Sequence, residues 1–272
     1  MSNPITEAIR AGRCLAGIAT VIDAHGHGGP YFNFWVPDSD PASMVRLMDH
    51  IGIQTLLFAP HLAVTADPSA GNDLAIAWSK RFPGRLLGYA VPYPHRPELV
   101  ADDLRRALDA GLVAIKLHPS LHGCSIDSPG YRAAWEVARE RHTFILSHTW
   151  YGDRYCAPGM FARYAEEFPE VPVIIGHSGG EPRGFLEAIE LAHKYSNILL
   201  DTTGSAVTGE WIVRMVNEVG AERVLYGSDM PFLDPRFCLG KAALSGLAPD
   251  QLRLVLGLNA KCLLARCGVS LS

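Results

Sequence analysis

Eight short apolar runs recur along this chain of 272 residues, and their even spacing constrains the fold more than any other feature. They cover residues 17–23, 55–59, 86–90, 112–116, 143–147, 173–176, 197–201 and 223–227. The ends of consecutive runs lie 25 to 36 residues apart. Runs that are apolar on both faces are typical of parallel strands covered by helices. The pattern therefore predicts eight strands, each followed by a connecting segment.

Amphipathic stretches with helical spacing lie between several of these runs. The clearest cover residues 98–110, 131–141, 182–195 and 210–219, and further helices are expected at 5–15, 249–256 and 259–267. Eight strand–helix units in roughly 250 residues are what a (β/α)₈ TIM barrel requires. An open doubly wound sheet also alternates strands and helices, but eight near-even units favour closure. We therefore predict an α/β fold, a single TIM-barrel domain spanning residues 1–272 with its core at about 18–265 and extra terminal helices.

The charge balance and the cysteine content restrict which classes of binding partner and which cellular compartment we expect. The chain has 24 Lys and Arg against 28 Asp and Glu, a net charge of −4, and no basic cluster. It has no apolar stretch of the ~18 residues that span a bilayer. The six cysteines lack C-x-x-C spacing, and the apolar run after Arg13 ends in a histidine motif rather than a signal-peptide cleavage site. We expect a cytoplasmic, soluble protein with reduced thiols that binds neither nucleic acid nor membrane.

The polar residues that follow the predicted strands are the candidate site. The active site of a TIM barrel lies at the C-terminal ends of its strands. These ends carry Asp23, His25, His27, Lys116, His118, His148, His177, Asp201 and Asp229. Five other histidines fall in helices, helix ends or loops and are predicted to be solvated or structural, namely His50, His61, His95, His142 and His193. The role of His118 and His122 stays open, because their loop could overhang the site.

The ligand types at these positions indicate a metal site. His25 and His27 are two residues apart on a strand, so their side chains point the same way and both can bind one cation. An isolated His-x-His is weak support, but His148, His177 and Asp229 also follow predicted strands. Imidazoles with a carboxylate suit Zn²⁺ or a similar divalent metal. Such a metal lowers the pKa of bound water to about 7, and an aspartate beside it can act as a ligand or a proton shuttle.

The residues around these positions resemble the amidohydrolase superfamily, and more narrowly its amidohydrolase-related branch, which contains hydrolases, decarboxylases and hydratases. The resemblance covers residues 20 to 265. The motifs that carry it are Asp23–His27 (DAHGH), Ile115–Pro119 (IKLHP), Ser147–Thr149 (SHT), Ile175–Gly180 (IGHSGG) and Tyr226–Pro231 (YGSDMP).

The resemblance implies one or two divalent metal ions, Zn²⁺ being the expected one. In a two-metal site, His25, His27 and Asp229 would bind the more buried ion. A carboxylated Lys116 would bridge to a second ion held by His148 and His177. In a one-metal site the ligands would be His25, His27, His148 and Asp229, with His177 polarising the substrate or the water. An unmodified Lys116 paired with a nearby carboxylate is the alternative.

Three loops could shape a substrate pocket. The loop 31–37 is strongly aromatic, and it could form an apolar wall or pack on the barrel top or on a partner subunit, as in a homodimer. Trp150 and Arg154 follow His148, and Arg183 follows His177. Together with His118 these three are the candidate substrate-binding residues, with either arginine able to meet a substrate carboxylate.

The leading functional hypothesis is a metal-dependent hydrolase acting on an amide, cyclic amide or ester of a small molecule. Asp229 and His177 are its candidate catalytic residues, with Asp229 carrying the proton to the leaving group. The alternative is a Zn²⁺-dependent decarboxylase or hydratase, that is, a lyase of a small carboxylic acid. Two metals per chain would favour hydrolysis and one would favour the lyase. A metal-binding protein without catalysis is a third possibility that no residue pattern supports.

Overall fold

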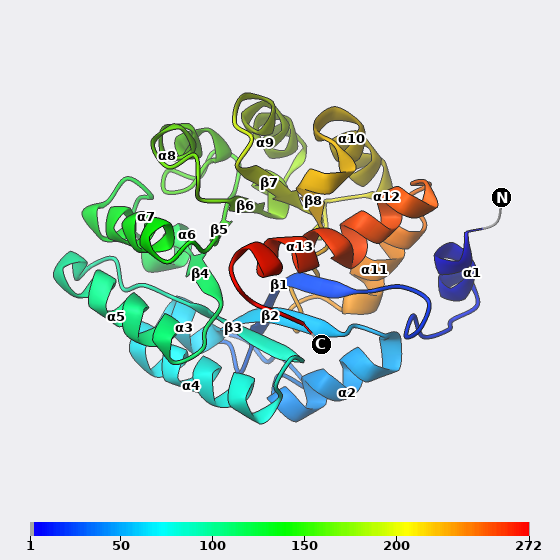
Figure 1. Ribbon diagram of the computed structural model, residues 1–272, viewed down its shortest axis with the longest axis horizontal. Helices are drawn as coiled ribbons and strands as arrows, with labels where there is room; N and C mark the ends of the chain where they lie inside the picture. Colours follow the sequence, from blue (N-terminus) through cyan, green and yellow to red (C-terminus); the bar gives the residue numbers. More distant parts are fainter. Residues whose placement is uncertain (1–2, 272) are drawn as a thin grey trace.

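Eight parallel strands form a ring at the centre of the molecule, surrounded by helices (Figure 1). The computed structural model describes residues 3–271. The strands pair in chain order and are β1 (Ile22–Gly28), β2 (Thr55–Pro60), β3 (Leu86–Ala90), β4 (Ala114–Leu117), β5 (Ile145–His148), β6 (Val173–Gly176), β7 (Ile198–Asp201) and β8 (Val224–Leu225). This confirms the predicted α/β TIM barrel in a single domain.

Backbone hydrogen bonds join the last strand to the first and close the ring. The amide of Ala24 donates to the carbonyl of Tyr226 at 2.9 Å, and the amide of His27 donates to the carbonyl of Met230 at 2.7 Å. The segment after β8 therefore continues along β1, which brings the end of the eighth repeat next to the His-x-His motif.

Alternation along the strands divides the buried apolar residues into two clusters. Leu57, Tyr89, Leu146 and Ile174 belong to the cluster inside the barrel, together with residues of α13 (Asn259–Arg266). Their neighbours on the same strands belong to the larger cluster between the barrel and the surrounding helices. Because both faces of each strand are covered, the strands are apolar throughout, which is why their sequence shows continuous runs rather than alternation.

Most of the helices begin with a proline, which the first helical turn tolerates because its amides have no intrahelical partner. The remaining α-helices are α1 (Pro4–Arg10), α2 (Pro41–Ile51), α3 (His61–Thr65), α4 (Pro68–Arg81), α5 (Pro97–Asp109), α6 (Pro119–His122), α7 (Pro129–Glu140), α8 (Ala162–Glu167), α9 (Pro182–Lys194), α10 (Gly209–Val219), α11 (Pro235–Ala243) and α12 (Pro249–Arg253). Short 3₁₀ turns cover η1 (Pro158–Phe161), η2 (His177–Gly179) and η3 (Ala221–Arg223), and a π-helical turn, η4, covers Leu254–Leu258.

The predicted helix 249–256 ends at Arg253 and the predicted strand 223–227 is reduced to Val224–Leu225, and two further elements differ by more. The first strand runs over Ile22–Gly28 rather than 17–23, because the apolar residues before Ile22 are an irregular lead-in and the ladder to β2 starts at the Ile22–Thr55 pair. The His-x-His motif therefore lies inside the strand. Helix α1 ends at Arg10 rather than at residue 15, since Gly12 adopts a left-handed φ of 63° that a helix cannot continue through.

No helix among residues 3–271 combines the length and the apolar character needed to cross a membrane. All six cysteines are free thiols in the described part of the chain; Cys156 and Cys238 are buried and Cys262 is exposed.

Candidate metal centre and cavity

A cavity of about 330 Å³ opens where the C-terminal ends of the strands meet. It is lined by His27, Tyr31, His61, Val64, His118, Ser120, Leu121, His148, Trp150, His177, Asp229 and Phe232. Most of the predicted site residues thus line a single cavity, and besides the histidines five of the lining side chains have aromatic or aliphatic character that suits an organic ligand.

Three of the predicted ligands form a compact group. One nitrogen each of His25 and His177 and one carboxylate oxygen of Asp229 all lie within 4.8 Å of one another. Two imidazoles and a carboxylate are a donor set for Zn²⁺, Mn²⁺ and similar divalent ions. His177 also has a buried Nδ1 with no hydrogen-bond partner among the described residues. The residues present therefore fit a divalent metal ion, and His25, His177 and Asp229 form the candidate site.

His25 is oriented by a buried carboxylate behind it. Its Nδ1 lies 2.7 Å from Oδ2 of Asp201, and Thr203 Oγ1 donates to the same oxygen at 3.0 Å. A carboxylate oxygen accepts, so Nδ1 of His25 carries the proton and Nε2 is left free to bind a cation. The Nζ of Lys116 lies 2.7 Å from that Nε2. Lys116 therefore reaches the centre of the site, as predicted for the end of the fourth strand.

His27 has the same tautomer for a different reason. Its Nδ1 lies 3.1 Å from the carbonyl oxygen of Ala59, so Nδ1 donates and Nε2 is an acceptor. That Nε2 lies 3.4 Å from Oδ1 of Asp229. His27 and His148 adjoin the three-residue group without belonging to it; the ring centroids of His148 and His177 are 4.8 Å apart.

Unusual backbone geometry presents the ligands from β6 and β8. Asp229, His177 and Ser178 have left-handed φ angles of 66°, 61° and 46°, which non-glycine residues adopt at a cost of about 1–3 kcal/mol each. The surroundings hold these angles: the amide of Asp229 donates to the carbonyl of His25 at 2.8 Å, and Ser178 Oγ donates to the carbonyl of Asp201 at 2.6 Å.

Glycine is required where the backbone passes His25. A Cβ on Gly227 would lie 2.8 Å from Cβ of His25 and 2.1 Å from Oγ1 of Thr203. A Cβ on Gly176 would lie 3.0 Å from Cε1 of His25 and 2.5 Å from a backbone oxygen of Ser147. All four distances are shorter than ordinary van der Waals contacts, so these two glycines leave the space that the His25 side chain occupies.

Burial shifts the titration of every group at this centre. It raises the pKa of the Asp229 carboxyl, against the opposing effect of the Lys116 charge. It also lowers the pKa of Lys116, which the nearby carboxylates partly offset. Burial holds the pKa values of His25 and His177 well below the usual range, and the neighbouring cations act in the same direction. The histidines are therefore neutral near pH 7, the form that binds metal.

Two of the four predicted substrate-binding residues line the cavity. The ring of His118 stacks on His148 with centroids 4.2 Å apart, and Trp150 stacks on His148 with centroids 6.2 Å apart. The two arginines do not reach the cavity. Arg154 is exposed and packs over the ring of Tyr155, and Arg183 is exposed at the start of α9. In the sequence each arginine follows a predicted ligand histidine, but the sequence order does not determine which way its side chain points.

The sequence interpretation missed His61 and Phe232 as cavity residues. His61 was predicted to be solvated or structural, yet its side chain is fully buried in the cavity wall. The other four histidines of that group, at positions 50, 95, 142 and 193, are exposed. A signal for His61 was available, because it directly follows β2 in the same way that His148 ends β5. Phe232 follows Asp229 by three residues and was not singled out.

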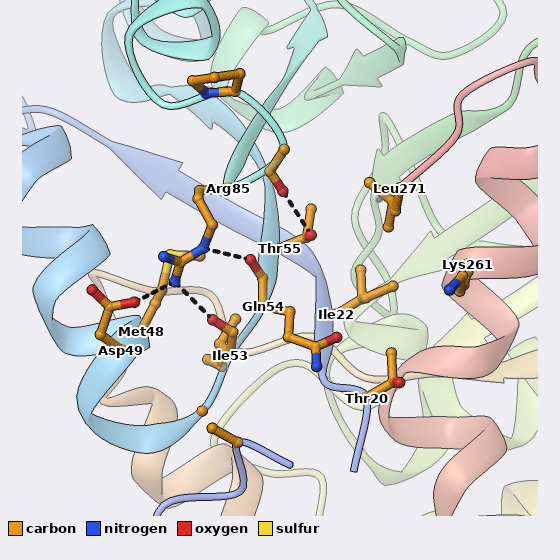
Figure 2. Close-up of a pocket in the computed structure, with 14 residues that line it drawn as sticks. Thr20, Ile22, Met48, Asp49, Ile53, Gln54, Thr55, Arg85, Lys261 and Leu271 are labelled. Atoms are coloured by element: carbon orange, nitrogen blue, oxygen red, sulfur yellow. Dashed lines mark hydrogen bonds and ion pairs between the residues drawn. The ribbon is translucent and has the colours of Figure 1, made fainter.

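A larger cavity, of about 550 Å³, lies at the opposite end of the barrel, where β1 and β2 begin (Figure 2). Arg85 lies in its wall, where Nε donates to the carbonyl of Gln54 at 2.7 Å and Nη2 contacts Asp49 at 2.7 Å and the carbonyl of Ile53 at 3.1 Å. Thr55 Oγ1 likewise donates to the carbonyl of Gly84 at 2.8 Å. These contacts connect α2 with the segments that begin β2 and β3. Their role is therefore structural.

A model of the amidohydrolase family matches residues 22–266, that is, the whole barrel and all of the candidate site. The chain belongs to the amidohydrolase family. This confirms the resemblance inferred from the motifs, and it makes the protein an enzyme of that family.

Named members of this family point to one kind of reaction. The γ-resorcylate decarboxylase of Polaromonas sp. is 26% identical over 253 residues, covering 69% of this chain and 76% of its own length. A crystal structure of 2,6-dihydroxybenzoate decarboxylase with 2,6-dihydroxybenzoate superposes with a TM-score of 0.75 at 18% identity, covering 91% of this chain and 99% of that chain. A dihydroxybenzoic acid decarboxylase from Polaromonas sp. JS666, solved with manganese and the inhibitor 2-nitroresorcinol, superposes with a TM-score of 0.69 at 18% identity, covering 91% and 97%.

These amidohydrolase-family relatives are decarboxylases and not hydrolases. The comparisons therefore favour the alternative function drawn from the sequence, a lyase, over the leading hypothesis of a hydrolase.

Proposed function

We propose that this protein is a metal-dependent decarboxylase of a small aromatic carboxylic acid. The observation that carries the proposal is the composition of the cavity wall. Aromatic rings line the cavity beside His25, His177 and Asp229, and no arginine or lysine stands among the described residues that line it. Lys116, whose Nζ lies 2.7 Å from Nε2 of His25, does not line the cavity, so a metal ion on those three residues would supply the charge that balances a substrate carboxylate.

The residues of the site would have the following roles. His25, His177 and Asp229 would hold the metal, with His27 and His148 beside them and Asp201 orienting His25. When bound, a divalent ion supplies the positive charge that neutralises and positions the substrate carboxylate. Trp150 and Phe232, which line the cavity, would pack against the aromatic ring of the substrate.

Decarboxylation needs one proton, and Asp229 is placed to deliver it. The ring carbon that bears the carboxylate takes up a proton. The bond from that carbon to the carboxylate then breaks, its electron pair returns to the ring, and CO₂ leaves. Asp229 lines the cavity and has two carboxylate oxygens, so one can face the metal while the other carries the proton.

The test is a direct assay of the two reaction classes. Protein loaded with Mn²⁺ or Zn²⁺ is incubated with 2,6-dihydroxybenzoate and related hydroxybenzoates, and loss of the acid is followed by chromatography alongside CO₂ release. We expect equimolar loss of acid and release of CO₂, abolished by a chelator and restored by the metal. Hydrolysis of a cyclic amide or an ester without any CO₂ release, by protein holding two metals and a carboxylated Lys116, would contradict the proposal and favour a hydrolase.

A further inference from the structure

His61 is a buried histidine whose position the metal site does not explain. It begins α3 directly after β2, and its ring forms part of the cavity wall with a side-chain exposure of 0%. Its Nδ1 lies 2.6 Å from the carbonyl oxygen of Gly29. A carbonyl oxygen only accepts, so Nδ1 carries the proton and Nε2 is a hydrogen-bond acceptor. That Nε2 has no partner within residues 3–271.

The ring of His61 lies against His27, which adjoins the candidate metal ligands. The rings of His61 and His27 stack with centroids 5.1 Å apart and planes 17° apart. Both rings anchor Nδ1 on a backbone carbonyl, of Gly29 and of Ala59, so both leave Nε2 as an acceptor. For His27 that nitrogen lies 3.4 Å from Oδ1 of Asp229. His61 has the same tautomer as His27, and its Nε2 has no hydrogen-bond partner within residues 3–271.

Two further aromatic rings pack against His61. Phe232 meets His61 edge-on with centroids 4.6 Å apart, and Tyr31 does so at 5.4 Å. Neither makes a hydrogen bond to Nε2. A buried acceptor without a donor is unfavourable, so a ligand that supplies the donor is bound in preference to one that does not.

We infer that His61 is a substrate-binding residue whose Nε2 accepts a hydrogen bond from a hydroxyl group of the bound acid. This inference rests on the proposed function and narrows its substrate class. The carboxylate would lie at the metal group, and His61 stacks on His27 beside that group. The hydroxyl would therefore be close to the carboxylate on the ring.

The inference is tested by binding rather than turnover. Calorimetric titration of the Mn²⁺-loaded protein compares 2-hydroxybenzoate with 2-fluorobenzoate, and 3-hydroxybenzoate with 3-fluorobenzoate, because fluorine is close to a hydroxyl in size but donates no hydrogen bond. We expect at least one hydroxy acid to bind roughly tenfold or more tightly than its fluoro partner.

Two substitutions distinguish the role of Nε2 of His61, the proposed acceptor, from that of Nδ1, which donates to Gly29. In His61→Asn the amide nitrogen can still donate to Gly29, but no acceptor stands at the Nε2 position. In His61→Gln the amide oxygen stands near that position. We expect the preference for the hydroxy acid to disappear in H61N and to return in H61Q, with bound Mn²⁺ and the unfolding temperature close to wild type. His61→Phe, which keeps the ring stacking, replaces H61N if the latter does not fold.

Each result has a defined meaning. A hydroxyl preference that persists in H61N and H61F, or that is missing from the wild type, overturns the role of His61 while leaving the decarboxylase proposal intact. If the wild type binds none of the four acids, the proposed function itself fails and this inference fails with it.

Discussion

Nδ1 of His25 lies 2.7 Å from Oδ2 of Asp201, and this buried contact decides which nitrogen of His25 faces the metal group. The two residues come from opposite parts of the chain, one from β1 and the other from the end of β7. A carboxylate behind a ligand histidine fixes its tautomer and raises its basicity. Asp201 is therefore a positioning residue for the metal site although it does not line the cavity.

Asp201→Asn should weaken metal binding while leaving the fold in place. The amide can still accept from Nδ1, but it lacks the charge that makes His25 a strong ligand. We expect the affinity for Mn²⁺ or Zn²⁺ to fall by about 10- to 100-fold, measured by competition with a fluorescent chelator. Asp250→Asn, at an exposed carboxylate, is the matched control. An unchanged affinity in D201N would show that Asp201 does not tune the site.

Asp229→Asn should abolish most of the turnover. It removes both a charged ligand and the proposed proton donor, so we expect decarboxylation to slow by about 10²- to 10⁴-fold in steady-state assays. The midpoint of urea unfolding should stay close to wild type, because the Asp229 side chain lies at the cavity and not in the packed core. Asp127→Asn is an exposed control. Turnover at the wild-type rate in D229N would exclude the proton-transfer role.

Lys116→Met should distinguish one metal from two. In a one-metal decarboxylase Lys116 is not a ligand, so wild type and K116M should each bind one metal per chain. In a two-metal site bridged by carboxylated Lys116, the count would fall from two to one. Elemental analysis of protein purified with excess metal measures the count, with the exposed Lys80→Met as control.

Stability should fall as the pH drops below 6.5 because buried histidines stay neutral in the folded state, and His61 and His122 are two of them that lie outside the candidate ligands His25 and His177. Burial lowers the pKa of His61 and of His122 to about 4. Their unfolded pKa is 6.5, so below that pH the unfolded state binds more protons than the folded state. The stabilisation is complete above pH 6.5 and is lost toward pH 4, by about 1.4 kcal/mol per pH unit for each histidine.

Urea unfolding of metal-free protein between pH 7.5 and 4.5 measures this dependence. His122→Gln should make stability fall less steeply with decreasing pH, whereas the exposed His193→Gln should not. Equal slopes in wild type and H122Q would refute the assignment for His122.

The sequence by itself determined the fold and most of the metal group. Eight apolar runs define eight strands, since a strand covered on both faces must be apolar along its length. The barrel places their C-terminal ends together, so His25, Lys116, His148, His177 and Asp229 could be assigned to one site before the structure was known. Local pattern was enough here because each of these residues lies on or beside a strand whose direction the fold dictates.

Only the tertiary structure decided how the neighbouring side chains use their hydrogen-bonding atoms. His61 resembled an incidental histidine until its Nδ1 was found on Gly29, and Asp201 was one strand-end carboxylate among several until it was found behind His25. Conversely, Arg154 and Arg183 adjoin ligand histidines in sequence yet stay outside the cavity. The physical reason is that a side chain's role depends on contacts between segments far apart in sequence, as in the 176 residues that separate His25 from Asp201.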